Sequence, residues 1–321
     1  MPDHGFVDGG GLRAAPVSHS LGRRGLLLGA AAAALSACTA APAPPAPPTR
    51  TPGPATTAPV PTPTPTPTPT PSPTPALPGR ADIVSRYAGR PATQWGWEVD
   101  GVVNRLDDPH SPDADATGVA LTFDACGGGT AGNGYDEALI DTLRRHGVTA
   151  TLYLNARWIA ANPTLAAELA DDPLFVLASH GTRHVPLSVA GRSAYGIAGT
   201  ADVGEVYDEV TAGFDWFAEH TGALPATMRP GTAHCDEVAA AIAIDLGVPI
   251  AGLSVNADDG ATLGASGVAQ RLASVRPGDI VLGHFNRPAG GTAEGLAQAL
   301  PRLLGAGTTF VGLGTRGRPA P

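Results

Sequence analysis

Several apolar runs in this sequence end in a side chain that could do acid–base chemistry. Asp124 closes the run VALTF, Arg229 follows the run ATM, and His284 closes the run IVLG. An aspartate can accept a proton, and an arginine beside it lowers the pKa of the carboxyl and orients it. Histidine is the side chain best suited to donate a proton near neutral pH. The three positions therefore predict an acid–base site.

The segment SHGTRH places two histidines, His180 and His184, four residues apart. On one helical turn such residues share a face, and their imidazole nitrogens can bind one metal ion. The alternative is a pair of surface histidines without a ligand. We favour a metal site, because the pair follows an apolar run whose end is expected to face Asp124.

Two further segments carry candidates of lower priority. In SVNADDGAT, we favour Asp258 over Asp259 as the acid that holds His284 in one tautomer, because Asp259 fits the turn that follows. His234 is a further candidate ligand, although its position favours the start of a helix instead.

Short apolar runs and amphipathic segments alternate along the chain. The runs cover residues 119–123, 149–154, 174–178, 226–228, 248–255, 279–282 and 308–313, and the segments cover residues 135–146, 203–220, 237–246, 266–275 and 292–304. This alternation predicts an α/β fold with parallel strands and crossover helices. About seven strands indicate an incomplete or distorted (β/α) barrel, with the candidate side chains together at the carboxyl ends of its strands.

The first part of the chain is predicted to be a targeting signal followed by a linker. Arg23 and Arg24 precede an apolar run that is too short to span a bilayer, and small residues precede Cys38. We expect a twin-arginine, lipoprotein-type signal peptide over residues 1–38 and a disordered Pro/Thr-rich linker over residues 39–79. An N-terminal extension over residues 80–118 and the main domain over residues 119–321 would follow.

Charge and cysteine content narrow the partners and the compartment. The net charge is −9 and no basic stripe is present, so nucleic acid is not an expected partner. Besides Cys38, the chain has Cys126 and Cys235. A disulfide between them would close a loop of about 110 residues and could contribute up to about 4.7 kcal/mol.

The order of these motifs resembles the polysaccharide deacetylases, carbohydrate esterase family four with its NodB-homology domain. The resemblance implies that Asp124 in TFDAC is the general base and that His180 and His184 bind a divalent metal, most often zinc. By the same resemblance, Arg229 steadies the base and the backbone N–H of Thr232 helps to stabilise the oxyanion. Asp258 would tune His284, the general acid of the Leu-x-His motif.

The resemblance further implies the activity. The protein would be a metal-dependent hydrolase that removes N-acetyl groups from a cell-wall or other extracellular polysaccharide such as peptidoglycan. It would lie outside the cytoplasm, anchored to the membrane by a lipid on Cys38. Two alternatives stay open: a non-catalytic glycan-binding relative, and a metal hydrolase acting on another amide or ester.

One departure from the family bears directly on the metal. The family has TFDD, and its second aspartate is a metal ligand, whereas this chain has Ala125 at that place. Asp124 could move to bind the metal, Cys126 could supply a thiolate, or His234 could complete the site. The remaining alternative is that metal and activity are lost. Gly231 and Thr232 also replace the last two residues of the usual Arg-Pro-Pro-Tyr.

Overall fold

The computed structural model describes residues 77–315 of the chain. Five parallel strands form its central sheet in the order β4-β3-β2-β9-β8. The strands are β2 (Ala120–Ala125), β3 (Ala150–Leu154), β4 (Phe175–Ser179), β8 (Val255–Asn256) and β9 (Ile280–His284). Strands β2, β3 and β4 are buried along their whole length, as expected of a parallel sheet that is covered on both faces.

A second parallel pair continues the curve of the sheet. β1 (Val102–Val103) pairs with β7 (Ile250–Ala251), and Met228 forms isolated parallel bridges to both Ser179 and Ile250. The predicted α/β architecture, an incomplete barrel of parallel strands, is thus confirmed. The predicted run at 248–255 divides into β7 and β8, because the chain leaves one pair at Gly252 and joins the other. The predicted strand at 308–313 is reduced to a single bridge between Val119 and Phe310.

The helices begin and end at recognisable capping residues. Asp136, Asp202 and Asp236 accept backbone N–H groups at the starts of α2, α5 and α7, and Gly147 ends α2 in the left-handed conformation. The bounds are α1 (Arg80–Tyr87), α2 (Glu137–His146), α3 (Ala156–Ala161), α4 (Pro163–Asp171), α5 (Val203–Thr211), α6 (Phe214–Thr221), α7 (Glu237–Asp245), α8 (Ala265–Leu272) and α9 (Thr292–Gly305), with a 3₁₀ turn η1 (Gly231–Ala233).

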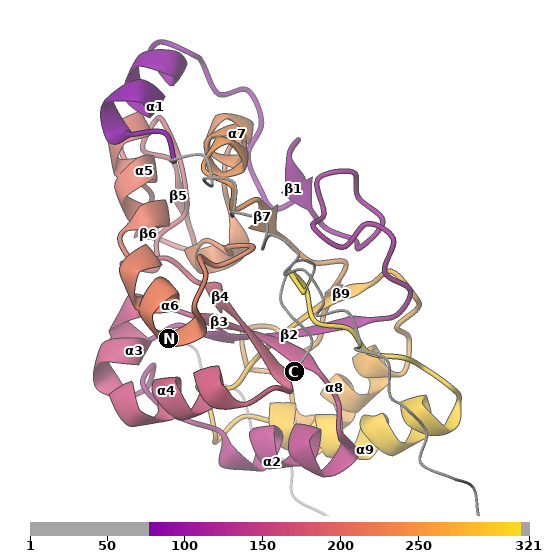
Figure 1. Cartoon of the computed structure of the whole chain (residues 1–321). Helices are drawn as coiled ribbons and strands as arrows, with labels where there is room; N and C mark the ends of the chain where they lie inside the picture. The colour runs from indigo at the N-terminus through magenta and orange to yellow at the C-terminus, as the bar shows by residue number, and fades with distance from the viewer. Residues whose placement is uncertain (1–76, 316–321) are drawn as a thin grey trace, which may run out of the picture. The chain divides into compact units, whose positions relative to one another are not determined.

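Two helix layers pack against the strands. Helices α2, α8 and α9 lie together below the sheet in Figure 1, where their apolar faces and those of β2 and β3 make the largest core cluster. A second cluster joins α1, α5 and α7, so residues before position 119 contribute both a helix and strand β1. The predicted helix at 203–220 is two helices, because Ala212 and Gly213 interrupt it.

Some expectations fall outside the described residues. The signal peptide at 1–38, Cys38 and nearly all of the linker at 39–79 belong to this part of the chain. No helix within residues 77–315 combines the length and the apolar character needed to cross a membrane. Antiparallel strands β5 (Ser193–Ala194) and β6 (Ile197–Ala198) form a small hairpin away from the sheet.

Candidate functional site

Strand register places the predicted base and the predicted acid side by side. In the parallel pairing of β2 with β9, Asp124 is the partner of His284. Adjacent strands lie about 4.8 Å apart, and both residues stand at the carboxyl ends of their strands. The sequence expectation that strand ends bring these side chains to one edge therefore agrees with the register.

Arg229 fixes the carboxylate of Asp124. One guanidinium nitrogen donates to Asp124 Oδ1 at 2.7 Å and to Thr122 Oγ1 at 2.9 Å. The other two guanidinium nitrogens donate to the backbone carbonyls of Ala251 and Gly252. Because Arg229 is fully buried and all of these partners are fixed, Asp124 is held in one orientation.

The surroundings of Asp124 also set its charge. Burial acts to raise the pKa of the carboxyl, but the positive charge of Arg229, with His180 and His284, lowers it, and the net shift is downward. Asp124 is therefore ionised at neutral pH, which is the form that accepts a proton.

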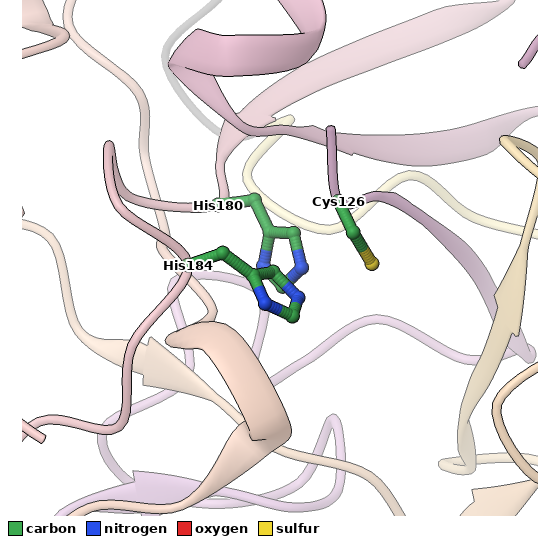
Figure 2. Close-up of side chains that lie close together, drawn as sticks. All are labelled: Cys126, His180 and His184. Carbon is green, nitrogen blue, oxygen red and sulfur yellow. The ribbon is translucent and has the colours of Figure 1, made fainter. Parts of the chain in front are cut away.

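Three side chains converge beside Asp124. One ligand atom from each of Cys126, His180 and His184 lies within 4.8 Å of the other two, and Figure 2 shows the three side chains close together. His180 Nε2 is 3.7 Å from Asp124 Oδ2. Asp124 itself is not a member of this cluster, so its assignment as a metal ligand stays a prediction.

The two histidines do not lie on a helical turn, as their spacing had suggested. Residues 180–187 form a loop after β4, and His184 has a φ of 60°. This left-handed backbone turns the chain back, so that the two rings meet edge to face with centroids 4.8 Å apart. The loop thus brings together two side chains that were expected to meet through helical periodicity.

His180 has the features of a ligand whose partner is a cation. Its Nδ1 donates to the backbone carbonyl of Arg229 at 2.8 Å, which leaves the lone pair on Nε2. That Nε2 is buried and has no hydrogen-bond partner among the described residues. Buried polar atoms are nearly always satisfied, so a metal ion bound with Cys126 and His184 would fill this need.

Cys126 offers the third candidate ligand atom, and its surroundings favour the thiolate form. Burial acts to raise the pKa of its thiol, but the neighbouring imidazoles of His180, His184 and His284 outweigh it and hold the pKa well below its usual range. A thiolate with two imidazoles is a donor set found in metal sites with three protein ligands. The residues therefore fit a divalent metal ion.

Ala125 points away from this cluster. Side chains alternate along a strand, so Asp124 and Cys126 share one face while Ala125 takes the other. Ala125 is fully buried in the core cluster between the sheet and the helices, which also contains Trp158 and Phe285. In this chain the candidate ligand therefore lies two residues after Asp124, at Cys126.

His284 is held by a buried acid, as predicted. Its Nδ1 lies 3.0 Å from Asp258 Oδ1, and its backbone N–H and the Thr292 hydroxyl donate to Oδ2 at 2.7 and 2.9 Å. Burial acts to lower the pKa of His284, but Asp258 and then Cys126 raise it well above its usual value. The Asp258 carboxylate therefore favours the protonated form of His284. Asp259 instead pairs with Arg271 at the surface.

The remaining candidates, Thr232 and His234, lie on the turn η1 and directly after it. Thr232 has a φ of 68°, and its buried hydroxyl oxygen has no hydrogen-bond partner among the described residues. His234 Nδ1 lies 2.7 Å from the Thr232 carbonyl, and its ring lies among aromatic side chains rather than in the Cys126 cluster. Cys126 and Cys235 are both free thiols, so the disulfide considered from the sequence is absent.

Sequence reasoning missed Glu209, which shapes the loop between the two histidines. The buried carboxylate accepts the backbone N–H groups of Thr182 and Arg183 at 2.9 Å and the Thr182 hydroxyl at 2.7 Å. It also pairs with the Arg183 guanidinium at 3.2 Å. A signal was present: an acid three residues after Val206, on the apolar face of a helix, needs buried partners.

Comparison with known proteins adds a family match. Residues 111–251 match the family model described as polysaccharide deacetylase. Over 194 residues, the chain is 29% identical to the peptidoglycan-N-acetylglucosamine deacetylase PgdA of Listeria monocytogenes. That alignment covers 60% of this chain and only 37% of the relative, so the chain spans little more than a third of the relative's length.

Solved structures support the fold. The Bc1960 peptidoglycan N-acetylglucosamine deacetylase superimposes with a TM-score of 0.51 at 22% identity, covering 61% of this chain and 89% of that one. BA3943 of Bacillus anthracis, described as a CE4 family pseudoenzyme, superimposes with a TM-score of 0.50 at 21% identity, covering 60% and 63%. At these identities the likeness concerns the fold alone.

Proposed function

Because this chain belongs to the polysaccharide deacetylase family, we propose that it is a metal-dependent hydrolase that removes N-acetyl groups from a cell-wall polysaccharide. The observation that carries the proposal is the convergence of Cys126, His180 and His184 beside the ionised Asp124. Peptidoglycan is the substrate class that we propose, in line with the name of the Listeria relative.

Zinc is the metal that we propose, held by Cys126, His180 and His184. Thiolate and imidazole ligands favour zinc over the harder magnesium and calcium ions, which prefer oxygen ligands. When bound, such an ion polarises the acetamide carbonyl and lowers the pKa of a water molecule. With Cys126 as the third ligand, Asp124 is left free to act as a base.

The chain's own groups would then move the protons. Asp124, oriented by Arg229, accepts a proton from the attacking water. The backbone N–H of Thr232 donates to the oxyanion. His284, held protonated by Asp258, donates its proton to the departing amine nitrogen. The products are acetate and a free amino sugar.

We also propose that the protein works outside the cytoplasm, anchored to the membrane by a lipid on Cys38. The twin-arginine pair and the small residues before Cys38 support this proposal. A Cys38→Ala variant should appear in the soluble fraction of cells instead of the membrane fraction. Equal membrane association of both proteins would contradict the anchor.

The test of the activity uses the purified protein and two variants. We expect about one zinc per chain and acetate release from N-acetylglucosamine oligomers or peptidoglycan, with both lost in His180→Ala. Cys235→Ala is the control, because Cys235 lies in the core away from the cluster. Acetate release that survives His180→Ala would exclude the metal mechanism. Glycan binding with neither metal nor acetate would instead support the non-catalytic alternative.

A further inference from the structure

Aromatic side chains gather around His234 at the surface. The rings of Trp95, Trp97 and Tyr195 have centroids 6.1, 5.2 and 5.1 Å from the His234 ring. Trp97 is 41% exposed and Tyr195 is 75% exposed, and Ile197 on the same hairpin is exposed as well. We call Trp95, Trp97, Tyr195 and His234 the aromatic surface. Large apolar side chains left open to solvent in one cluster are typical of a binding site.

Backbone pairing builds one side of this surface. Gly96 exchanges both backbone hydrogen bonds with Cys235, at 3.1 and 2.9 Å, in an antiparallel bridge. Residues on either side of Gly96 therefore share a face, which places Trp95 and Trp97 together against His234. Glu237 accepts two backbone N–H groups from the same segment at 2.6 and 2.9 Å and fixes its position. The two indoles are thus held in place before any ligand arrives.

The hairpin of β5 and β6 supplies the other side. Tyr195 occupies its turn with a φ of 51°, followed by Gly196 with a φ of 76°. Glycine, asparagine or aspartate is the usual choice for the first of these places, because a large side chain is strained there. The strained position carries an aromatic ring that packs on His234 by its edge and leaves most of its area in solvent.

The aromatic surface adjoins the candidate active site through the turn η1. His234 Nδ1 bonds to the carbonyl of Thr232, and a side chain at Gly231 would collide with the backbone of His184. One short turn therefore contacts the His180–His184 loop through Gly231 and leads directly into His234 of the aromatic surface. A polymer bound at the metal site has the aromatic surface as its neighbour.

We propose that the aromatic surface binds sugar rings of the polysaccharide that extend beyond the residue being deacetylated. The inference rests on the proposed function, which places a glycan at the metal site. Pyranose rings have flat faces of C–H groups, which pack on aromatic faces, and hydroxyl edges, which bond to indole N–H and phenol groups. The aromatic side chains are held in place at separate positions, so that each can pack on a different sugar ring of a glycan.

Direct binding tests the inference without any chemistry. The hexamer of N-acetylglucosamine is titrated into metal-free protein and followed by calorimetry and tryptophan fluorescence. Trp97→Ala and Tyr195→Ala should each weaken binding about tenfold, as expected for exposed aromatic contacts at an interface. Trp97→Phe should recover most of the affinity, because a flat ring is restored. Leu224→Ala is the control: Leu224 is similarly exposed, at 40%, but precedes Met228 and so lies toward the other end of the strands.

Acetate release separates this inference from the proposed function. In active enzyme, Trp97→Ala should lower the ratio of kcat/KM for the hexamer to that for the dimer about tenfold. If no variant or wild-type protein releases acetate, the proposed function fails, while the calorimetric titration still decides whether the surface binds glycan. Wild-type affinity for the hexamer in both Trp97→Ala and Tyr195→Ala, or no binding by the wild-type protein, would overturn the inference.

Discussion

Cys126 and Cys235 lie in opposite kinds of surroundings, which shift the pKa of the two thiols in opposite directions. Cys126 stands at the end of β2 among three histidines, which hold the pKa of its thiol well below the usual range. Cys235 lies in the core cluster of α1, α5 and α7, where burial and the neighbouring acids raise the pKa of its thiol. Its backbone exchanges hydrogen bonds with Gly96, and its side chain belongs to the apolar core cluster.

This difference shows that the surroundings of a cysteine decide whether it is suited to bind a metal or to fill a core. A thiolate is the form that binds metals, and positive or hydrogen-bonding neighbours are needed to produce it. Only Cys126 has such neighbours. From the sequence, the two cysteines were a pair that could bridge, whereas in the fold they belong to separate clusters with separate chemistry.

The largest expected effect comes from removing the sulfur of Cys126. Cys126→Ala leaves two protein ligands, so we expect zinc to be lost and acetate release to fall by at least about a thousandfold. Cys235→Ala should keep zinc and activity and cost about 1 kcal/mol of stability through a small cavity. The measurements are metal content by mass spectrometry and acetate release.

A third variant sharpens the comparison. Cys126→Asp replaces a soft ligand by a hard one, so metal preference should move from zinc toward manganese or magnesium. Full zinc content and activity in Cys126→Ala would show that Cys126 is not the third ligand and that Asp124 or another group takes this role.

The next prediction tests which face of β2 carries the side chain of residue 125. Ala125→Asp introduces a carboxylate at the position where the family has its ligand, but Ala125 faces the apolar core. An unpaired buried charge should destabilise the fold by about 3–5 kcal/mol, measured by urea unfolding, and should not restore a metal ligand in Cys126→Ala. Ala131→Asp on the exposed loop is the control, with an expected change within about 0.5 kcal/mol. If Ala125→Asp is stable and restores zinc binding to the Cys126→Ala variant, then residue 125 faces the site and not the core.

A smaller effect is expected from changing Glu209, which supports the loop between His180 and His184. Glu209→Gln replaces one acceptor oxygen by an NH₂ group that faces the N–H donors of residues 182 and 183, so His184 should lose its fixed place. Zinc affinity should fall about ten- to a hundredfold, as for other groups that orient metal ligands. Glu205→Gln is a matched control, since Glu205 also pairs with Arg183 but its side chain is 39% exposed, whereas that of Glu209 is buried. An equal loss of zinc affinity in both variants would show that the ion pair with Arg183, and not the hydrogen bonds of Glu209 to the loop backbone, supports the site.

Much of the fold and part of the site could be predicted from the sequence. The β2, β3, β4 and β9 strands are apolar runs of ordinary length, and the ends of β2 and β9 pointed to Asp124 and His284, because parallel strands end at one edge. Arg229 was found at the end of the short run 226–228. The interaction of Asp258 with His284 was predicted from one short segment. Helices α3 and α4 were missed, because two short helices that meet at Asn162 show little periodicity.

The geometry of the metal cluster could not be predicted in full. The loop from His180 to His184 depends on a left-handed residue and on Glu209, which is distant in sequence. Cys126 was one alternative among several, because its convergence with His180 and His184 depends on contacts between distant segments of the chain. Such long-range contacts leave little trace in a single sequence.

The smallest predicted effect concerns the pH range in which His284 can act as the general acid. Asp258 is the main group that raises the pKa of His284, so Asp258→Asn should lower that pKa. A general acid must be protonated, and activity falls as pH rises through its pKa. The alkaline limb of kcat/KM should therefore move down by about one pH unit, whereas Cys235→Ala should leave it in place. The stability that the raised pKa contributes follows the same sign, since it is present at low pH and is lost as pH rises through the folded-state pKa. An alkaline limb that stays in place in Asp258→Asn would show that another group donates the proton.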